Sequence, residues 1–375
     1  MTLRFDRDAE EQFIDTKGIA AVARAAVDIT QKRFSERYYR GKSRKLHVLW
    51  VNTRVFKAGA FMRPNGDHEV RISYGAAIEI YRDALLFPEA CQRVLTRTEF
   101  DPIFNLLSYG NKRSDVLPAE LRPEDAKLHI VQYMTTWLFL HEQAHLLQQH
   151  GELARSQGFS ELLSHDGGLN DGKDAAQPAN TGEASLRHAF EFAADFEALT
   201  LLLLRESREI DEPRLWCLAA GLMCMFHRFN EIARGSVEDL PSGTHPHPAL
   251  RMRVAMNRIE QIFEMPDFIA TSNWEGGSAR ARAIMDHAVY TADAYWHLRY
   301  IDLKERSTLI DYVTENLVVP ASYQSAIFRT WSAVQMGIIR NHLGDGDAVT
   351  LFLRSPQAVG GRVDPLKVPP SPPGK

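Results

Sequence analysis

The segment from Leu138 to Gln148, Leu-Phe-Leu-His-Glu-Gln-Ala-His-Leu-Leu-Gln, constrains the fold more than any other part of the chain. Its two histidines, His141 and His145, continue an apolar stripe at helical spacing that is formed by Ile130, Met134, Trp137 and Leu138. This periodicity predicts a helix whose apolar face enters the core. Two histidines on such a face require partners, because buried polar groups without them cost free energy.

A metal ion is one such partner. The four-residue interval puts His141 and His145 about one turn apart on one helix face, so both imidazoles can reach one ion. Zinc binds histidine nitrogens at about 2.0–2.1 Å and leaves a position for water in a tetrahedral shell. Glu142, about 100° round the helix, is placed to accept a proton from that water. The alternative is chance, since a chain with 14 histidines shows this short pattern on the order of a few per cent of the time.

A third ligand is available downstream, where Glu191 and Asp195 are again four residues apart. Two carboxylates one turn apart repel each other unless a cation or donors lie between them. One carboxylate on zinc and the other accepting from a ligand histidine resolves this repulsion. The alternative is a surface helix with both groups in solvent and paired with Arg187, which is disfavoured by the apolar neighbours Phe190, Phe192, Phe196 and Leu199.

A third segment, Ser242 to Arg251, contains His245 in a proline-rich stretch directly before an amphipathic region at residues 249–263. Pro248 fits the first position of a helix. His245 in the preceding loop could donate to a developing oxyanion, and Arg251 could neutralise a buried carboxylate such as Asp195. Taken alone, the same residues describe a capped loop and nothing more.

Together the three segments resemble the gluzincin zinc peptidases of the HtpX and CAAX prenyl endopeptidase type. In that family the metal helix is followed by Glu-aromatic-x-Ala-Asp, and then by His-Pro with an arginine six residues after the histidine. This chain has the same order over about 110 residues, as His141–His145, Glu191–Asp195, and His245–Pro246 with Arg251. Those relatives are embedded in membranes. A soluble branch with a similar arrangement is that of the phage exclusion protein Lit.

The resemblance implies a role for each matching residue. His141, His145 and Glu191 would be the ligands of one zinc ion, and Glu142 would be the general base. Asp195 would orient a ligand histidine, while His245 and Arg251 would support the transition state and the site. The fold implied is zincin-like. An exposed strand edge would hold an extended substrate peptide, as zincins generally do.

The pattern along the rest of the chain predicts one α+β domain over residues 1–354, with a small N-terminal sheet before a mainly helical body. Turn and strand signals delimit the sheet, and helical periodicity dominates from Pro123 onward. The expected parts are helices at 9–38, strands at 46–51, 55–62 and 69–73, a helix at 75–87, a metal-binding helical body at 123–263, a long loop at 157–183, a helical part at 280–343 and a flexible tail at 355–375.

Composition narrows the possible partners. A net charge of −4 over 375 residues gives no electrostatic reason to expect nucleic acid. No apolar run reaches the roughly 18 residues that cross a bilayer, and charged residues interrupt the N-terminus, so we expect a cytoplasmic protein without a membrane span. The three cysteines offer no disulfide framework, and we expect Cys217 and Cys224 to pack in the core.

The sequence therefore predicts a zinc metalloendopeptidase that acts on a protein or peptide. Two alternatives use the same residues. One is a zinc-dependent amidohydrolase with a non-peptide substrate, and the other is a catalytically silent regulatory module in which zinc is structural.

Overall fold

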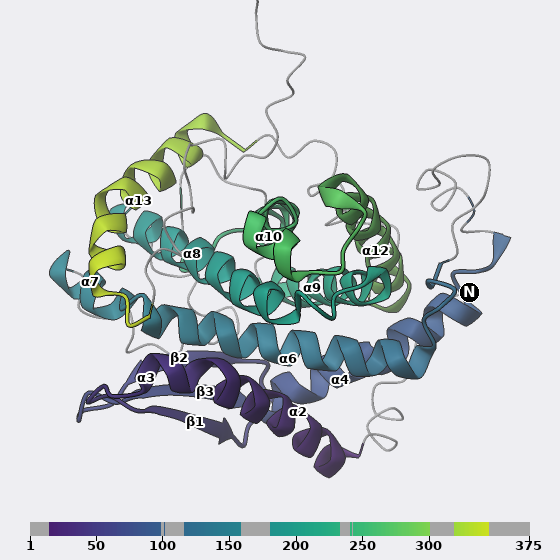
Figure 1. Cartoon of the computed structure of the whole chain (residues 1–375), viewed down its shortest axis with the longest axis horizontal. Coiled ribbons are helices and arrows are strands. Elements are labelled where there is room, and N and C mark those ends of the chain that lie inside the picture. Colours follow the sequence, from purple (N-terminus) through teal and green to yellow (C-terminus); the bar gives the residue numbers. More distant parts are fainter. Residues whose placement is uncertain are drawn as a thin grey trace, which may run out of the picture.

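The computed structural model describes residues 15–98, 101, 116–158, 181–232, 241, 243–300 and 319–344. Within these residues a small sheet precedes a body of helices, so the chain is α+β, as predicted. Figure 1 shows the long helix α6 (Pro123–Leu147) crossing the molecule between the sheet and the later helices. The strands are β1 (Leu46–Val51), β2 (Ala58–Met62) and β3 (His68–Ser73).

The sheet has the order β1-β3-β2, in which β3 runs parallel to β1 and antiparallel to β2. The strand predicted at 55–62 begins three residues later than expected. The reason is that the Ser73 side chain takes the place of part of the ladder. Ser73 Oγ donates to Val55 O and accepts from Lys57 N, while Lys57 O still accepts from the backbone of Ser73. Because β2 is a terminal strand of the sheet, one of its edges has no partner strand among the residues that the structure describes.

The helix predicted at 75–87 is longer than expected and forms α4 (Tyr74–Arg93). Ser73 Oγ caps its first turn by accepting from Ala76 N at 3.0 Å. Pro88 lies inside the helix, where it removes one backbone hydrogen bond. Packing offsets this loss, because the preceding Phe87 is fully buried and stacks on Trp216 at 5.3 Å between ring centroids.

The predicted N-terminal helical region divides into three pieces. An α-helix is followed by a π-helical turn and a last short helix, and residues 9–14 lie outside the described part of the chain. The pieces are α2 (Thr16–Thr30), η1 (Gln31–Ser35) and α3 (Glu36–Tyr39).

Three helices are buried around their whole circumference over their central parts: α6, α8 (Thr181–Glu206) and α9 (Glu212–Ile232). In α6 every residue from Tyr133 to Ala144 is buried, so the single apolar stripe predicted for this helix was too narrow. α6 packs against α4, α8, α9 and β2. A Cβ added at Gly221 of α9 would lie 2.9 Å from the Met134 side chain, which shows how closely α9 approaches α6.

The remaining helices surround this centre. α10 (Pro248–Ile262) packs on α8 and α9, α12 (Gly277–Tyr300) on α9, and α13 (Ala321–Asn341) on α8. Two short helices, α7 (His150–Ser156) and α11 (Pro266–Thr271), complete the described part. Residues 181–183 already belong to α8, so the predicted loop at 157–183 is shorter at its end. Residues 159–180 and the predicted tail lie outside the described residues.

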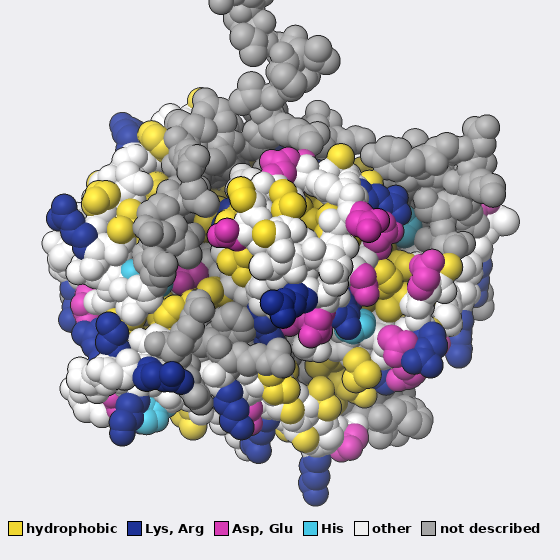
Figure 2. Space-filling model, in the orientation of Figure 1, with side chains coloured by type: hydrophobic (Ala, Val, Ile, Leu, Met, Phe, Trp, Pro, Cys, Tyr) yellow, Lys and Arg dark blue, Asp and Glu magenta, His cyan; other side chains and the backbone are white. Residues whose placement is uncertain are grey.

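Three further features, the surface charges, the cysteines and the apolarity of the helices, bear on the predictions from composition. On the face shown in Figure 2, acidic and basic side chains are interspersed among neutral and apolar ones. Cys91, Cys217 and Cys224 are buried and unpaired with one another, as expected for core residues. None of the described helices is both long enough and apolar enough to cross a membrane.

Candidate metal centre

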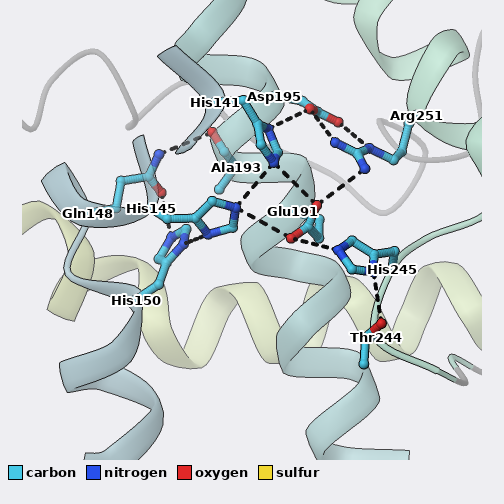
Figure 3. A network of polar contacts seen from close by, with 10 residues as sticks. All are labelled: His141, His145, Gln148, His150, Glu191, Ala193, Asp195, Thr244, His245 and Arg251. Atoms are coloured by element: carbon cyan, nitrogen blue, oxygen red, sulfur yellow. Dashed lines mark hydrogen bonds and ion pairs between the residues drawn. The ribbon is translucent and has the colours of Figure 1, made fainter. Parts of the chain in front are cut away.

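The two histidines of α6 point their Nε2 atoms toward the same place (Figure 3). His141 Nε2 and His145 Nε2 are 3.3 Å apart, and the two rings meet edge to face. Their side chains are only 6% and 11% exposed. The structure therefore brings the two predicted ligands together on one buried helix face.

Helix α8 adds Glu191 to this pair. Its Oε2 lies 3.4 Å from His141 Nε2, and its Oε1 lies 3.4 Å from His145 Nε2. Ala193 and Ala194 are fully buried beside it, and their small side chains let α8 approach α6 closely. Within the described residues, His141, His145 and Glu191 form a group whose potential ligand atoms all lie within 4.8 Å of one another.

On its other side, His141 contacts Asp195. Its Nδ1 lies 2.9 Å from Asp195 Oδ1. Arg251 donates from Nε and Nη2 to the two oxygens of the same carboxylate, at 2.8 Å each. Burial alone raises the pKa of Asp195, but Arg251 and His141 outweigh it and lower that pKa. With Nδ1 facing this carboxylate, His141 directs its Nε2 at the centre, where that nitrogen can bind a metal once its proton is lost.

The carboxylates set the protonation of the metal-free centre. Burial lowers the pKa of His141, but the negative charges of Asp195 and Glu191 outweigh it and raise this pKa to about 10. Burial raises the pKa of Glu191, yet His245, Arg251 and the two ligand histidines hold it well below its usual value. Without a metal, a proton on His141 therefore offsets part of the negative charge.

The loop before α10 places His245 at the edge of the group. Pro248 is the first residue of α10, as predicted. His245 Nε2 is 3.7 Å from Glu191 Oε1, and Thr244 Oγ1 is 2.8 Å from His245 Nδ1. Its side chain is 26% exposed, and its partial burial lowers its pKa. His245 thus lies beside the three potential ligands and not among them.

A cavity opens beside the centre and contains the carboxylate of Glu142. Glu142 is buried, and this burial raises its pKa, although His141 and His145 counteract the effect. A carboxylate next to apolar walls is suited to take up and release a proton. The other walls are Phe56, Ala58, Trp137, Leu138, His141, Glu191, Phe229, His245 and Arg251.

A further set of contacts, which the sequence did not predict, supports His145. His150 Nδ1 lies 2.8 Å from His145 Nδ1, and His150 Nε2 lies 2.8 Å from Gln148 Oε1 (Figure 3). Burial, and next the neighbouring His145, lower the pKa of His150 well below its usual value. The one signal in the sequence is that Gln148 and His150 follow the histidine pair closely.

The distances at the centre fit a tetrahedral ion. A tetrahedral shell with bonds of about 2.0–2.1 Å holds neighbouring ligand atoms about 3.3–3.4 Å apart. His141 Nε2 and His145 Nε2 are 3.3 Å apart, which matches such an edge, and each lies 3.4 Å from a different oxygen of Glu191. Two imidazoles and one carboxylate are also a donor set that zinc accepts with a fourth position left open.

The local charge and hydrogen bonding fit a divalent cation as well. Glu191 Oε2 is buried and accepts no hydrogen bond from the described residues. Among the described residues, the buried carboxylates of Glu191 and Asp195 contact the Arg251 guanidinium, and that of Glu142 lies near it. Three ionised carboxylates and one guanidinium carry a net charge of −2 when the imidazoles are neutral, as a bound metal requires. Buried charge requires compensation, and an ion with two positive charges supplies it.

Comparisons of the chain with models of known protein families, with curated proteins and with solved structures found no match. The geometry of the site therefore carries the functional argument.

Proposed function

We propose that the protein is a zinc-dependent endopeptidase in which His141, His145 and Glu191 hold one zinc ion per chain. The observation that carries the proposal is that potential ligand atoms of these three residues, from two helices, lie within 4.8 Å of one another, with the two Nε2 atoms 3.3 Å apart, the length of an edge of a zinc tetrahedron. Asp195 behind His141, together with the His245 loop, supports a zincin-like site of the gluzincin type.

The residues around the centre have separate tasks in hydrolysis. A bound zinc ion supplies Lewis-acid polarisation of the scissile carbonyl and acidifies water. Glu142, in the cavity wall, accepts the proton of the attacking water and passes it to the leaving nitrogen. His245, which lines the same cavity, donates to the carbonyl oxygen as negative charge develops on it. Asp195 and Arg251 hold His141 in its orientation.

Strand β2 supports a peptide as the substrate. Ser73 N donates to Lys57 O, and Arg63 N donates to Asp67 O, so alternate residues between them bond to β3. The backbone groups of Ala58, Ala60 and Met62 therefore face the edge without a partner strand. Ala58 also lines the cavity. An extended peptide paired with this edge would run into the cavity and pass Glu142.

The two alternatives lack an equivalent observation. A structural zinc site has four protein ligands and is closed. Here three ligands border a cavity that contains a carboxylate outside the ligand set. A non-peptide amide would use the same residues for chemistry, but it would leave the edge of β2 without a role.

The test combines metal analysis with a search for cleavage. Wild-type protein, Glu142→Gln and His141→Ala would be purified, their zinc content measured, and each incubated with a peptide library read by mass spectrometry. We expect about one zinc per chain in the wild type and in Glu142→Gln, and little in His141→Ala. Glu142→Gln should lose about 10²–10⁴-fold in turnover, because a general base contributes that much.

The outcomes separate the parts of the proposal. A wild-type protein that takes up no zinc, even when zinc is supplied, contradicts the metal assignment. Full turnover by Glu142→Gln contradicts the role of Glu142. Zinc uptake without cleavage of any peptide in the library, but with hydrolysis of small amides, would favour the amidohydrolase.

A further inference from the structure

His145 is held by a chain of polar contacts that leads away from the metal centre. His150 Nδ1 lies 2.8 Å from His145 Nδ1, on the side of the ring opposite the ligand atom Nε2. The His150 ring is buried and stacks on Phe190, with centroids 4.0 Å apart and planes 6° apart. His150 is therefore fixed in place by packing as well as by its polar contacts.

A break in the helix makes this contact possible. In a continuous helix, residue 150 would lie about 140° round the axis from His145, and the two rings could not meet. Instead, α6 ends at Leu147 and α7 begins at His150. Between them Gln149 has φ 53 and ψ 40, and it is the one non-glycine residue with positive φ in the described part of the chain. Such strained backbone is concentrated at functional sites.

The contacts of Gln148 show which of its amide atoms donates and which accepts. Its Nε2 lies 3.1 Å from Ala193 O and 2.7 Å from Glu197 Oε2. A backbone carbonyl and a carboxylate only accept hydrogen bonds, so this atom is the amide nitrogen and donates to both. Gln148 Oε1, on the opposite side, is then an acceptor.

The acceptor at Gln148 Oε1 determines which nitrogens of His150 and His145 carry protons. His150 Nε2, 2.8 Å from Gln148 Oε1, must donate its proton to that oxygen. A neutral imidazole has one N–H and one lone pair, so His150 Nδ1 is an acceptor. The proton between the two rings therefore belongs to His145 Nδ1. His145 is left with its lone pair on Nε2, directed toward His141 and Glu191.

The far end of this row of polar contacts, at His342, is also fixed by a backbone group. His342 Nε2 lies 3.0 Å from Glu197 Oε1, and Gly344 N donates to His342 Nδ1 at 2.9 Å. His342 therefore donates to Glu197 through Nε2. Leu343 N donates to Leu147 O, so the residues after α13 are attached to the end of α6 itself. We call the contacts from His145 through His150, Gln148 and Glu197 to His342 the relay. Its donors and acceptors are thus assigned from two backbone groups, Ala193 C=O and Gly344 N–H.

We propose that Gln148 and His150 are positioning residues that fix His145 as the Nδ1–H tautomer and thereby present its Nε2 to the metal. The inference rests on the proposed function for its purpose, but not for its geometry. In zinc proteins, the groups that hold ligand histidines contribute about 10–100-fold to metal affinity. Gln148 and His150 would thus support the histidine pair although they lie after it in the sequence.

The first test reads the tautomers directly. Long-range ¹H–¹⁵N spectra of the metal-free wild-type protein distinguish Nδ1–H from Nε2–H imidazoles. We expect His145 as the Nδ1–H form and His150 as the Nε2–H form. A solvated imidazole favours Nε2–H, so an Nε2–H form of His145 would overturn the proposal.

The second test measures zinc affinity by competition with a chelating dye. His150→Phe keeps a ring on Phe190 but cannot accept from His145, and we expect about 10–100-fold weaker binding. His150→Asn restores an acceptor near the position of Nδ1 and should recover most of this loss. His188→Phe is the matched control. It also removes a buried histidine of this region, one bonded to Tyr323 at 2.8 Å, and should bind zinc as the wild type does.

The outcomes distinguish this inference from the proposed function. If His150→Phe binds as tightly as the wild type, or if Asn at this position binds as weakly as Phe, the relay does not act through hydrogen bonding and the proposal is wrong. If the wild type binds no zinc, the proposed function fails, while the tautomer spectra still decide whether the relay holds His145.

Discussion

Arg251 and Asp195 form a bidentate ion pair inside the protein, with 2.8 Å on each arm and side chains only 4% and 1% exposed. Removing one partner of a buried pair is costly because the other charge is left uncompensated. This pair also connects α10 to α6, because the same carboxylate lies 2.9 Å from His141 Nδ1.

Replacing Arg251 by methionine should therefore destabilise the protein. We expect the free energy of unfolding to fall by about 3–5 kcal/mol, since Asp195 would remain buried without the guanidinium and with His141 as its remaining partner. Urea unfolding in the presence of a chelator measures this value without a contribution from zinc. The control is Arg122→Met, which breaks an exposed pair with Asp125 and should have no measurable effect. Equal midpoints for all three proteins would contradict the prediction.

Zinc binding should release a proton from His141. The pKa of this residue is raised to about 10 in the metal-free protein, so below that pH its proton competes with the metal for Nε2. Zinc affinity should accordingly rise with pH up to that region and fall as pH decreases. Calorimetry in buffers with different ionisation enthalpies would show a release of about one proton per zinc near neutral pH.

The variant Asp195→Asn provides the comparison for this measurement. It removes a negative charge that raises the pKa of His141, so fewer protons should be released on binding. A binding enthalpy that does not depend on the buffer in the wild type would show that His141 is already neutral without metal.

Chelation should leave the protein folded but less stable to heat. The three central helices are buried by their mutual packing, which does not require an ion. Zinc that binds only the native state adds about 4 kcal/mol when its free concentration is about 1,000 times Kd. Circular dichroism should therefore show retained helix at room temperature and a lower melting temperature in chelator. Complete unfolding by chelator would favour a structural zinc instead.

The edge of β2 can be tested with Ala60→Pro. Proline removes a backbone N–H that faces away from β3, so the sheet keeps its own hydrogen bonds while a substrate loses one. We expect kcat/KM for a cleaved peptide to fall about 5–10-fold, the equivalent of about 1 kcal/mol. Ala60→Ser retains the N–H and should stay near the wild type. A small unactivated amide substrate should be affected by neither change.

Much of the centre could be predicted because its residues obey helical spacing. Intervals of four place His141 above His145 and Glu191 above Asp195, and Pro248 indicates the first residue of the helix that carries Arg251. The structure brings all of these residues together. What spacing could not give was the distance between the two helices, which depends on the small alanines of α8 and on burial from every side.

The relay behind His145 was also beyond prediction, and the reason is a different one. It depends on a left-handed backbone at Gln149, and glutamine is not a residue that marks such a conformation. It also joins Gln148 to Glu197, which lies in α8, and to His342, which directly follows α13. The extent of α4 was missed similarly, because Pro88 predicts a helix end that packing around Phe87 overrides.

The turn at Gln149 has a consequence for anyone who would move this centre into another protein. Grafting residues His141 to His150 onto a straight designed helix would keep every amino acid and still separate the rings of His145 and His150. The bend is therefore part of the motif. A search for distant kin would do better to look for this backbone shape after a histidine pair than for the intervening letters.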